Sequence, residues 1–239
     1  MDSEIESRIE DDTKIIELDL NDTGAYYDRG DAYYTQDKHD LAIADFTSAI
    51  QKDPEFFEAY YARGLCYFLE EMYEKAIEDQ TTAIQLGPTD AETFYDRGNS
   101  YRRLGSDDLA LADYSRALEL NPQHLESAWG RGLVYYDRQN YESAISDFSH
   151  AIDLDPTYAQ LFYERALAYY VTGDYELALV DYDKAIQLDP TDADAYYGRG
   201  SVYYSEKRFD LAEKDFSKCI ELDPGYVNAH KARAYINEL

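Results

Sequence analysis

The chain has 239 residues, of which 45% are hydrophobic, and its 22 Lys and Arg against 50 Asp and Glu give a net charge of −28. So acidic a surface repels phosphate backbones, and we expect no nucleic-acid partner and no anionic membrane surface. No stretch approaches the ~18 apolar residues of a membrane-spanning helix, and the acidic start lacks the features of a secretory signal, so we expect no membrane insertion and a cytoplasmic setting.

The first segment, residues 1–22, is acidic throughout. Ile5, Ile9 and Ile16 would form one apolar stripe if this segment were helical. We therefore expect an N-terminal cap helix, with an acidic disordered tail as the alternative.

A repeat follows. The six prolines of the chain recur every 34 residues, at Pro54, Pro88, Pro122, Pro156, Pro190 and Pro224. With each proline at position 32, six units result: residues 23–56, 57–90, 91–124, 125–158, 159–192 and 193–226. Position 11 is tyrosine and position 20 is alanine in all six units, and position 8 is glycine in five. Such regular self-similarity indicates a stack of small structural units.

Each unit is expected to form two helices. Positions 4, 8 and 11 recur at helical spacing in the first, and positions 20, 24, 27 and 28 in the second. A turn near positions 15–16 should separate them, where Gly105 and Gly173 suit a left-handed helix end. Residues 227–239 match the first helix of a seventh unit, and we expect a C-terminal capping helix or partial repeat there.

The pattern of an aromatic near position 4, Gly at 8, Tyr at 11, Ala at 20, an aromatic at 24, Ala at 27 and Pro at 32 resembles the tetratricopeptide repeat, over residues 23–226. The resemblance implies an all-α fold, a right-handed α-α superhelix of six helix-turn-helix repeats plus end helices. It also implies a protein-binding role. The chain departs from the family locally, with Gln80 at position 24, and systematically, with Arg where the family has Leu at position 7.

Position 7 and position 23 carry opposite charges in every unit. Position 7 holds Arg29, Arg63, Arg97, Arg131, Arg165 and Arg199, and position 23 holds Asp45, Asp79, Asp113, Asp147, Asp181 and Asp215. Both positions border the contact between the two helices, so we predict that they pair, within or between units, as a partly buried ladder that fixes helix register. The alternative is a row of anion-binding arginines.

The resemblance also places positions 2, 5, 6, 9, 12 and 13 on the inner wall of the superhelix. Position 5 is aromatic in all six units and position 12 in five, and these positions share one helix face. The predicted partner-binding groove comprises Tyr61, Phe68, Tyr95, Asn99, Arg102, Arg103, Trp129, Leu133, Tyr136, Tyr163, Tyr170, Tyr197 and Tyr204. Rows of Tyr and Trp suit a binding surface, and the alternative is that these rings only pack against adjacent helices.

Acids accompany the rings, among them Glu58, Glu92 and Asp96. They favour a protein or peptide partner with basic and apolar side chains, unless the acidity serves solubility alone. Asn99 and Arg103 match in kind the residues with which one subtype of the family grips a C-terminal carboxylate. We regard pairing of Arg102 and Arg103 with nearby acids as the stronger interpretation.

Catalytic constellations are not recognisable. The four histidines occupy four different repeat positions, and Cys66 and Cys219 fall at small core positions, where we expect buried free thiols. We therefore expect no enzyme activity, no cofactor and no metal. The leading hypothesis is a protein–protein interaction scaffold. A regulatory or targeting module of a larger protein and a self-assembling structural protein are the alternatives, and a homo-oligomer is possible.

Overall fold

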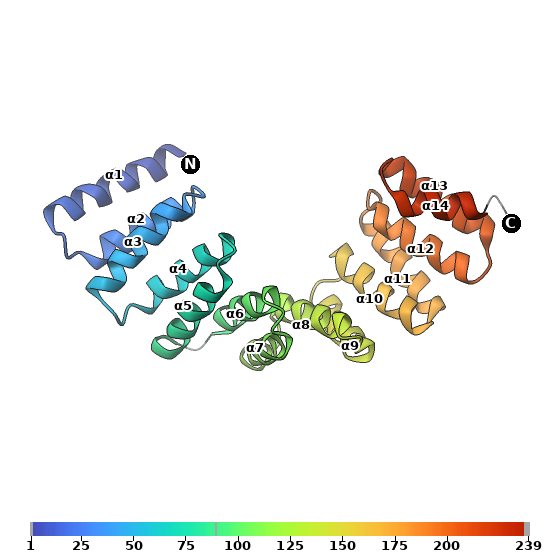
Figure 1. The fold of residues 1–239 in the computed structure, drawn as a ribbon, viewed down its shortest axis with the longest axis horizontal. Coiled ribbons are helices and arrows are strands. Elements are labelled where there is room, and N and C mark those ends of the chain that lie inside the picture. Colours follow the sequence, from blue (N-terminus) through green and yellow to red (C-terminus); the bar gives the residue numbers. More distant parts are fainter. Residues whose placement is uncertain (1, 89, 237–239) are drawn as a thin grey trace. The chain divides into compact units, whose positions relative to one another are not determined.

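The computed structural model describes residues 2–88 and 90–236, and these residues form fourteen α-helices and no strand (Figure 1). The expected all-α class is therefore confirmed. The chain divides into two compact parts, an N-terminal half, Met1–Ser127, and a C-terminal half, Ala128–Leu239. None of the described helices is both long and apolar enough to cross a membrane.

The N-terminal half starts with α1 (Asp2–Leu18), so the acidic first segment is a helix, beside α2. Three helix pairs follow: α2 (Thr23–Tyr34) with α3 (His39–Lys52), α4 (Phe57–Leu69) with α5 (Tyr73–Leu86), and α6 (Ala91–Arg103) with α7 (Asp107–Leu120). Ile16 is buried and Ile5 and Ile9 are half-buried, as an apolar stripe requires.

The division between the halves falls inside α8 (Leu125–Asp137). The C-terminal half continues with α9 (Tyr141–Leu154), α10 (Ala159–Thr172), α11 (Tyr175–Leu188), α12 (Ala193–Ser205), α13 (Phe209–Leu222) and α14 (Val227–Ile236). The last helix occupies the place of a seventh first helix. The final residues of the predicted capping segment, 237–239, lie outside the described residues.

The helices of each pair approach closely because small residues line their contact. Alanine at position 20 is fully buried, as at Ala42 and Ala144. Glycine at position 8 faces the ring at position 24, and a Cβ added to Gly132 would lie 2.7 Å from the Phe148 ring. A larger residue at position 8 would push the helices apart or displace the ring.

The turn between the two helices of a pair contains one left-handed residue at position 15. All six units have it: Asp37, Glu71, Gly105, Gln139, Gly173 and Lys207, with φ of 56°, 58°, 70°, 61°, 86° and 62°. Glycine at only two of these sites predicted the conformation. At the other four, the packing of the helix pair imposes a backbone conformation that costs a side-chain-bearing residue about 1 kcal/mol or more.

The arginines at position 7 pair with the aspartates at position 23 of their own unit, 16 residues later. In each unit Nε and Nη2 of the guanidinium donate to the two carboxylate oxygens, at 2.7–2.8 Å. In the first, second, third and fifth units, rings at positions 4 and 11 flank the guanidinium, as Tyr60 and Tyr67 flank Arg63 at 5.7 and 5.8 Å. The arginines are therefore engaged inside the fold, and an anion would have to displace an aspartate.

A third partner joins most of these arginines to the preceding unit. Nη1 of Arg63 donates to Thr47 Oγ1 at 2.9 Å, and Nη1 of Arg165 donates to Ser149 Oγ at 2.9 Å. At the first unit the acceptor is Thr13 of α1, so α1 takes the place of the second helix of a preceding unit. Each such arginine thus links two neighbouring units as well as the two helices of its own.

Candidate functional site

The rings at positions 5 and 12 of the first helices form the candidate binding surface, and each half of the chain carries its own row of them. In the N-terminal half these rings are Tyr27, Tyr34, Tyr61, Phe68 and Tyr95, and in the C-terminal half Trp129, Tyr136, Tyr163, Tyr170, Tyr197 and Tyr204. All of them are half-buried. They are neither core residues nor fully exposed ones, so part of each ring remains available at the surface.

The buried side of a position 5 ring packs against other rings. Tyr197 lies with its ring centroid 5.5 Å from that of Phe216 and 5.0 Å from that of Tyr226. Trp129 contacts Tyr158 at 5.5 Å in an edge-on arrangement. Such aromatic pairs hold a ring in place beyond the effect of its buried area.

The position 12 rings are held in the same way by position 17, at the start of the second helix. Phe68 contacts Tyr73 at 5.5 Å and Tyr136 contacts Tyr141 at 5.4 Å, both edge-on. These rings can therefore pack within their units and still form part of a surface. One side of the ring is fixed, and the other is presented on a rigid helix.

Carboxylates surround the rings and bind some of their hydroxyls. Tyr61 donates a hydrogen bond to Asp96 Oδ2 at 2.8 Å, and Tyr226 donates one to Asp194 Oδ1 at 2.6 Å. Burial raises the pKa of Asp96 to about 7, with the nearby Glu92 carboxylate acting in the same direction. The environment of Asp96 is thus poor in positive charge.

His124 lies beside Glu92, the carboxylate next to Asp96. Its Nε2 lies 2.9 Å from Glu92 Oε2, and its ring centroid is 5.2 Å from that of Tyr95. Ser127 donates its backbone N–H to Nδ1 of the same ring at 3.1 Å. His124 thus contacts Glu92 and Tyr95 of α6 and the start of α8.

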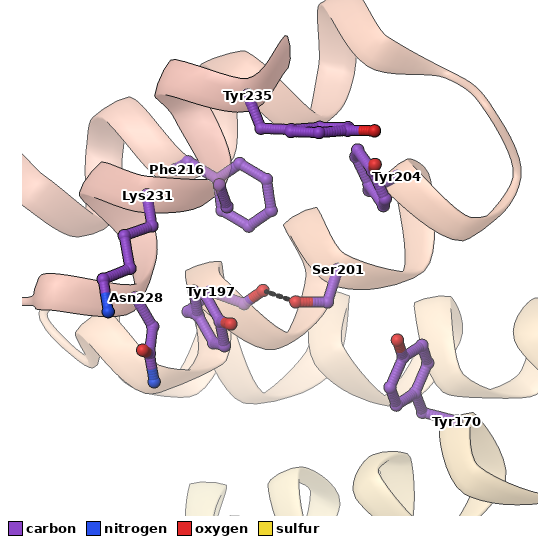
Figure 2. A pocket seen from close by; sticks show the side chains of 9 residues that line it. Tyr170, Tyr197, Ser201, Tyr204, Phe216, Asn228, Lys231 and Tyr235 are labelled. Atoms are coloured by element: carbon purple, nitrogen blue, oxygen red, sulfur yellow. Dashed lines mark hydrogen bonds between the residues drawn. The ribbon is translucent and has the colours of Figure 1, made fainter.

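A cavity of about 470 Å³ opens on this face in the C-terminal half (Figure 2). Tyr170, Tyr197, Ser201, Tyr204, Phe216, Asn228, Lys231, Ala232 and Tyr235 line it. The Ser201 hydroxyl donates to the Tyr197 carbonyl at 2.9 Å, so the polar atoms that remain at the rim belong mainly to tyrosine hydroxyls, Asn228 and Lys231. The cavity can accommodate an apolar side chain with a polar group beside it.

Three of the predicted groove residues, Tyr170, Tyr197 and Tyr204, lie together in this cavity. Asn228, Lys231 and Tyr235 are not among the predicted groove residues. They occupy positions 2, 5 and 9 of the partial seventh unit, so the repeat register extended to residue 235 would have indicated them. Lys231 also adds a positive charge to a face that we expected to be acidic.

Other predicted groove residues have a different environment. Asn99 accepts a hydrogen bond from the buried Tyr114 hydroxyl at 2.7 Å, so its side chain is held inside its unit. We expected Arg102 and Arg103 to pair with nearby acids, and among the described residues neither forms a salt bridge. Leu133 is half-buried on α8.

The N-terminal half has a smaller cavity of about 130 Å³. It lies between α2 and α4 and includes Tyr27, Asp31, Tyr34 and Tyr61 in its wall, with Phe46 of α3. No group of three or more His, Cys, Asp or Glu arranged to hold a metal ion occurs in residues 2–88 and 90–236.

Sequence profiles of the tetratricopeptide repeat match most of the chain. One matches residues 27–91, a second matches 91–124 and 193–226, and a third matches 132–173 and 168–206. The two ranges of the second profile coincide with the third and sixth units expected from the proline spacing. A comparison with curated proteins finds no match.

Several solved structures resemble the chain over most of its length. YrrB, described as a TPR protein with an unusual peptide-binding site, is 29% identical, with a TM-score of 0.68 over 77% of this chain and 95% of YrrB. MamA is 25% identical, with a TM-score of 0.65 over 67% of this chain and 94% of MamA. The C-terminal part of a TPR protein from Cytophaga hutchinsonii, at 23% identity, shares the fold with a TM-score of 0.76 over 89% of this chain and 85% of that one. Repeated proline spacing, paired helices and matching profiles agree, and the chain belongs to the tetratricopeptide-repeat family.

Proposed function

We propose that the chain is a protein-interaction scaffold that binds an extended segment of a partner protein across the rings at positions 5 and 12. The observation that carries this proposal is the state of those rings. They are half-buried, fixed on one side by other rings, and repeated along the first helices of each half. Rigid, partly exposed Tyr and Trp side chains bind protein segments at little cost in conformational entropy.

The partner segment should combine apolar and basic side chains. The cavity lined by Tyr197 and Tyr204 offers an aromatic surface for an apolar group. The carboxylates around the rings, such as Glu58 near Tyr27 and Glu92 near Tyr61, favour Lys or Arg, and the net charge of −28 draws such a segment in from a distance. Lys231 marks the one place in the larger cavity where an acidic group of the partner would fit.

The similarity to YrrB supports this class of function, since that protein is described as having a peptide-binding site. The arginines at position 7 do not contribute to binding in this proposal, because their donors are engaged with aspartate and hydroxyl groups of the chain.

Selection of random displayed peptides on the immobilised chain tests the proposal. We expect enriched sequences to share basic and apolar residues, and to be lost when the selection is repeated on a Tyr197→Ala, Tyr204→Ala variant. A matched control, Leu109→Ala with Leu177→Ala, removes two exposed apolar side chains from the second helices α7 and α11. The proposal would be contradicted if no peptide were enriched on the wild-type chain. It would also be contradicted if the same peptides were enriched equally on the tyrosine variant and on the leucine control.

A further inference from the structure

The small cavity of the N-terminal half has a composition suited to a cation. Its wall contains the rings of Tyr27, Tyr34 and Tyr61 and the carboxylate of Asp31, in a volume of about 130 Å³. Aromatic rings attract cations through their negative faces, and a carboxylate beside them adds a direct charge. Without the acid, the rings alone would attract a cation more weakly.

Contacts with residues outside the cavity fix the orientation of the tyrosine rings in its wall. Tyr27 packs against Phe46 at 5.6 Å and against Phe56 at 5.0 Å. The hydroxyl of Tyr61 is bound to Asp96 of α6 at 2.8 Å. The rings are therefore in place before any ligand arrives, which lowers the cost of binding.

The potential around the cavity is negative. Burial and then the carboxylates of Asp31 and Glu58 raise the pKa of Tyr27 above its ordinary value. Burial likewise raises the pKa of Tyr34, with Asp96 and Asp31 among the charges that act in the same direction. A positive group entering the cavity would meet these charges in a region partly shielded from water.

A cation of the chain itself already lies on the cavity's carboxylate. Arg8 of α1 places Nη2 3.2 Å from Asp31 Oδ2 and 3.6 Å from Asp28 Oδ1. The side chains of Arg8 and Asp31 are 44% and 40% exposed, and ion pairs as open as this one contribute little to stability. A cation that also contacts the rings can therefore displace Arg8 from Asp31.

We propose that this cavity receives a lysine side chain of the partner segment, and that Arg8 competes with that lysine for Asp31. The inference rests on the proposed function and deepens it by assigning one subsite. A lysine fits the site because its apolar stem can lie along the tyrosine rings while its compact ammonium group reaches the carboxylate. Arg8 of α1 then limits access to the site through its two open ion pairs, with Asp31 and Asp28.

The test uses the full chain and Nα-acetyl-lysine N-methylamide as the probe, followed by NMR of the backbone amides. We expect saturable shifts in α2 and α4 around Tyr34 and Tyr61, at millimolar probe concentrations. The norleucine analogue has a similar apolar stem without the ammonium group and should cause no such shifts. Equal shifts with norleucine would show a merely apolar cavity and would overturn the proposal, as would no shifts with lysine.

Three variants sharpen the result. Asp31→Asn should raise the dissociation constant of the lysine probe by about fivefold or more. Arg8→Ala should lower this dissociation constant by about two- to fivefold. Lys14→Ala makes the same change in net charge, and because Lys14 pairs with Asp11 it should leave the affinity unchanged. If Arg8→Ala and Lys14→Ala act alike, the competition is not at Asp31 and the proposal fails.

The outcome is separable from that of the proposed function. Peptide binding at the C-terminal rings can be followed by the fluorescence of Trp129, the single tryptophan. A chain that binds peptides there but does not respond to the lysine probe would refute the subsite alone. A chain that binds the probe but selects no peptide would refute the scaffold function and leave an isolated cation site.

Discussion

Arg63 donates two hydrogen bonds to Asp79, from Nε to Oδ2 at 2.7 Å and from Nη2 to Oδ1 at 2.8 Å, and this bidentate pair joins the two helices of its unit. The side chains of Arg63 and Asp79 are only 15% and 8% exposed. The repetition of this pair in every unit makes it the main polar feature of the fold.

Breaking this pair should destabilise the chain because it leaves a buried charge without its partner. We expect Arg63→Leu or Asp79→Leu to lower the free energy of unfolding by about 3–5 kcal/mol. The double variant should lose clearly less than the sum of the two single losses, as measured by urea denaturation. Single effects that simply add would contradict a specific pairing.

The left-handed residue at position 15 offers a test in both directions. Gly105→Ala should lower stability by about 1 kcal/mol through backbone conformation alone, because nothing lies within 4 Å of the added Cβ. Gln139→Gly, at φ of 61°, should raise stability by up to ~1 kcal/mol. As a control, Ala112→Gly inside the helix α7 should cost ~1 kcal/mol. A loss of stability in Gln139→Gly would show that its backbone is not strained.

Asp96 should make the stability of the chain depend on pH. Its pKa is raised from 3.8 to about 7 in the folded chain, so between these values the folded state binds a proton that the unfolded state has released. Its contribution to folding is complete below the unfolded value and is lost as the pH rises through the folded one, at ~1.4 kcal/mol per unit of pKa difference.

The variant Asp96→Asn should therefore lose less stability than the wild type when the pH is raised from about 5 to about 8. The exposed Asp137 provides a control, since Asp137→Asn changes the net charge equally but should leave the pH profile as in the wild type. Identical profiles for the wild type and Asp96→Asn would contradict a raised pKa. Tyr61, Glu92, Asp90 and His124 are the titratable groups that act most strongly on this carboxyl.

The two thiols should be inert in the folded chain. Both cysteines are free and buried, and burial raises the pKa of Cys66 to about 12 and that of Cys219 to about 11. Since the thiolate is the reactive form, labelling by a disulfide reagent should follow the rate of unfolding. Rapid labelling of either thiol under native conditions would show that the local packing opens more easily than the structure indicates.

Periodicity predicted the helices well, because helix pairs in a repeat depend on local spacing and on small residues at fixed positions. The turn was predicted less completely. Glycine marked Gly105 and Gly173, whereas Lys207 and Glu71 adopt the same conformation only because the paired helices require it. Such a tertiary constraint leaves no local signal at the residue that obeys it.

The hydroxyl partners of the arginines were missed for a similar reason. Thr47 and Ser149 lie 16 residues before the arginines they bind, in the preceding unit, and no pattern inside one unit reveals a contact between units. The candidate site shows the same limit. The aromatic rows follow from the repeat register. The positions of the two cavities could not be predicted, because they depend on how each ring packs against residues of neighbouring helices.

The central claim, that a partner segment binds across the aromatic rows, is tested most directly by titrating one selected peptide into matched variants and measuring its dissociation constant. Trp129→Ala with Tyr136→Ala removes two rings of the C-terminal half, and the Leu109→Ala, Leu177→Ala control removes exposed side chains elsewhere. We predict that the ring variant loses about tenfold or more in affinity while the control stays within about twofold of the wild type. Equal affinity for the wild type and the ring variant, with both folded, would contradict the claim.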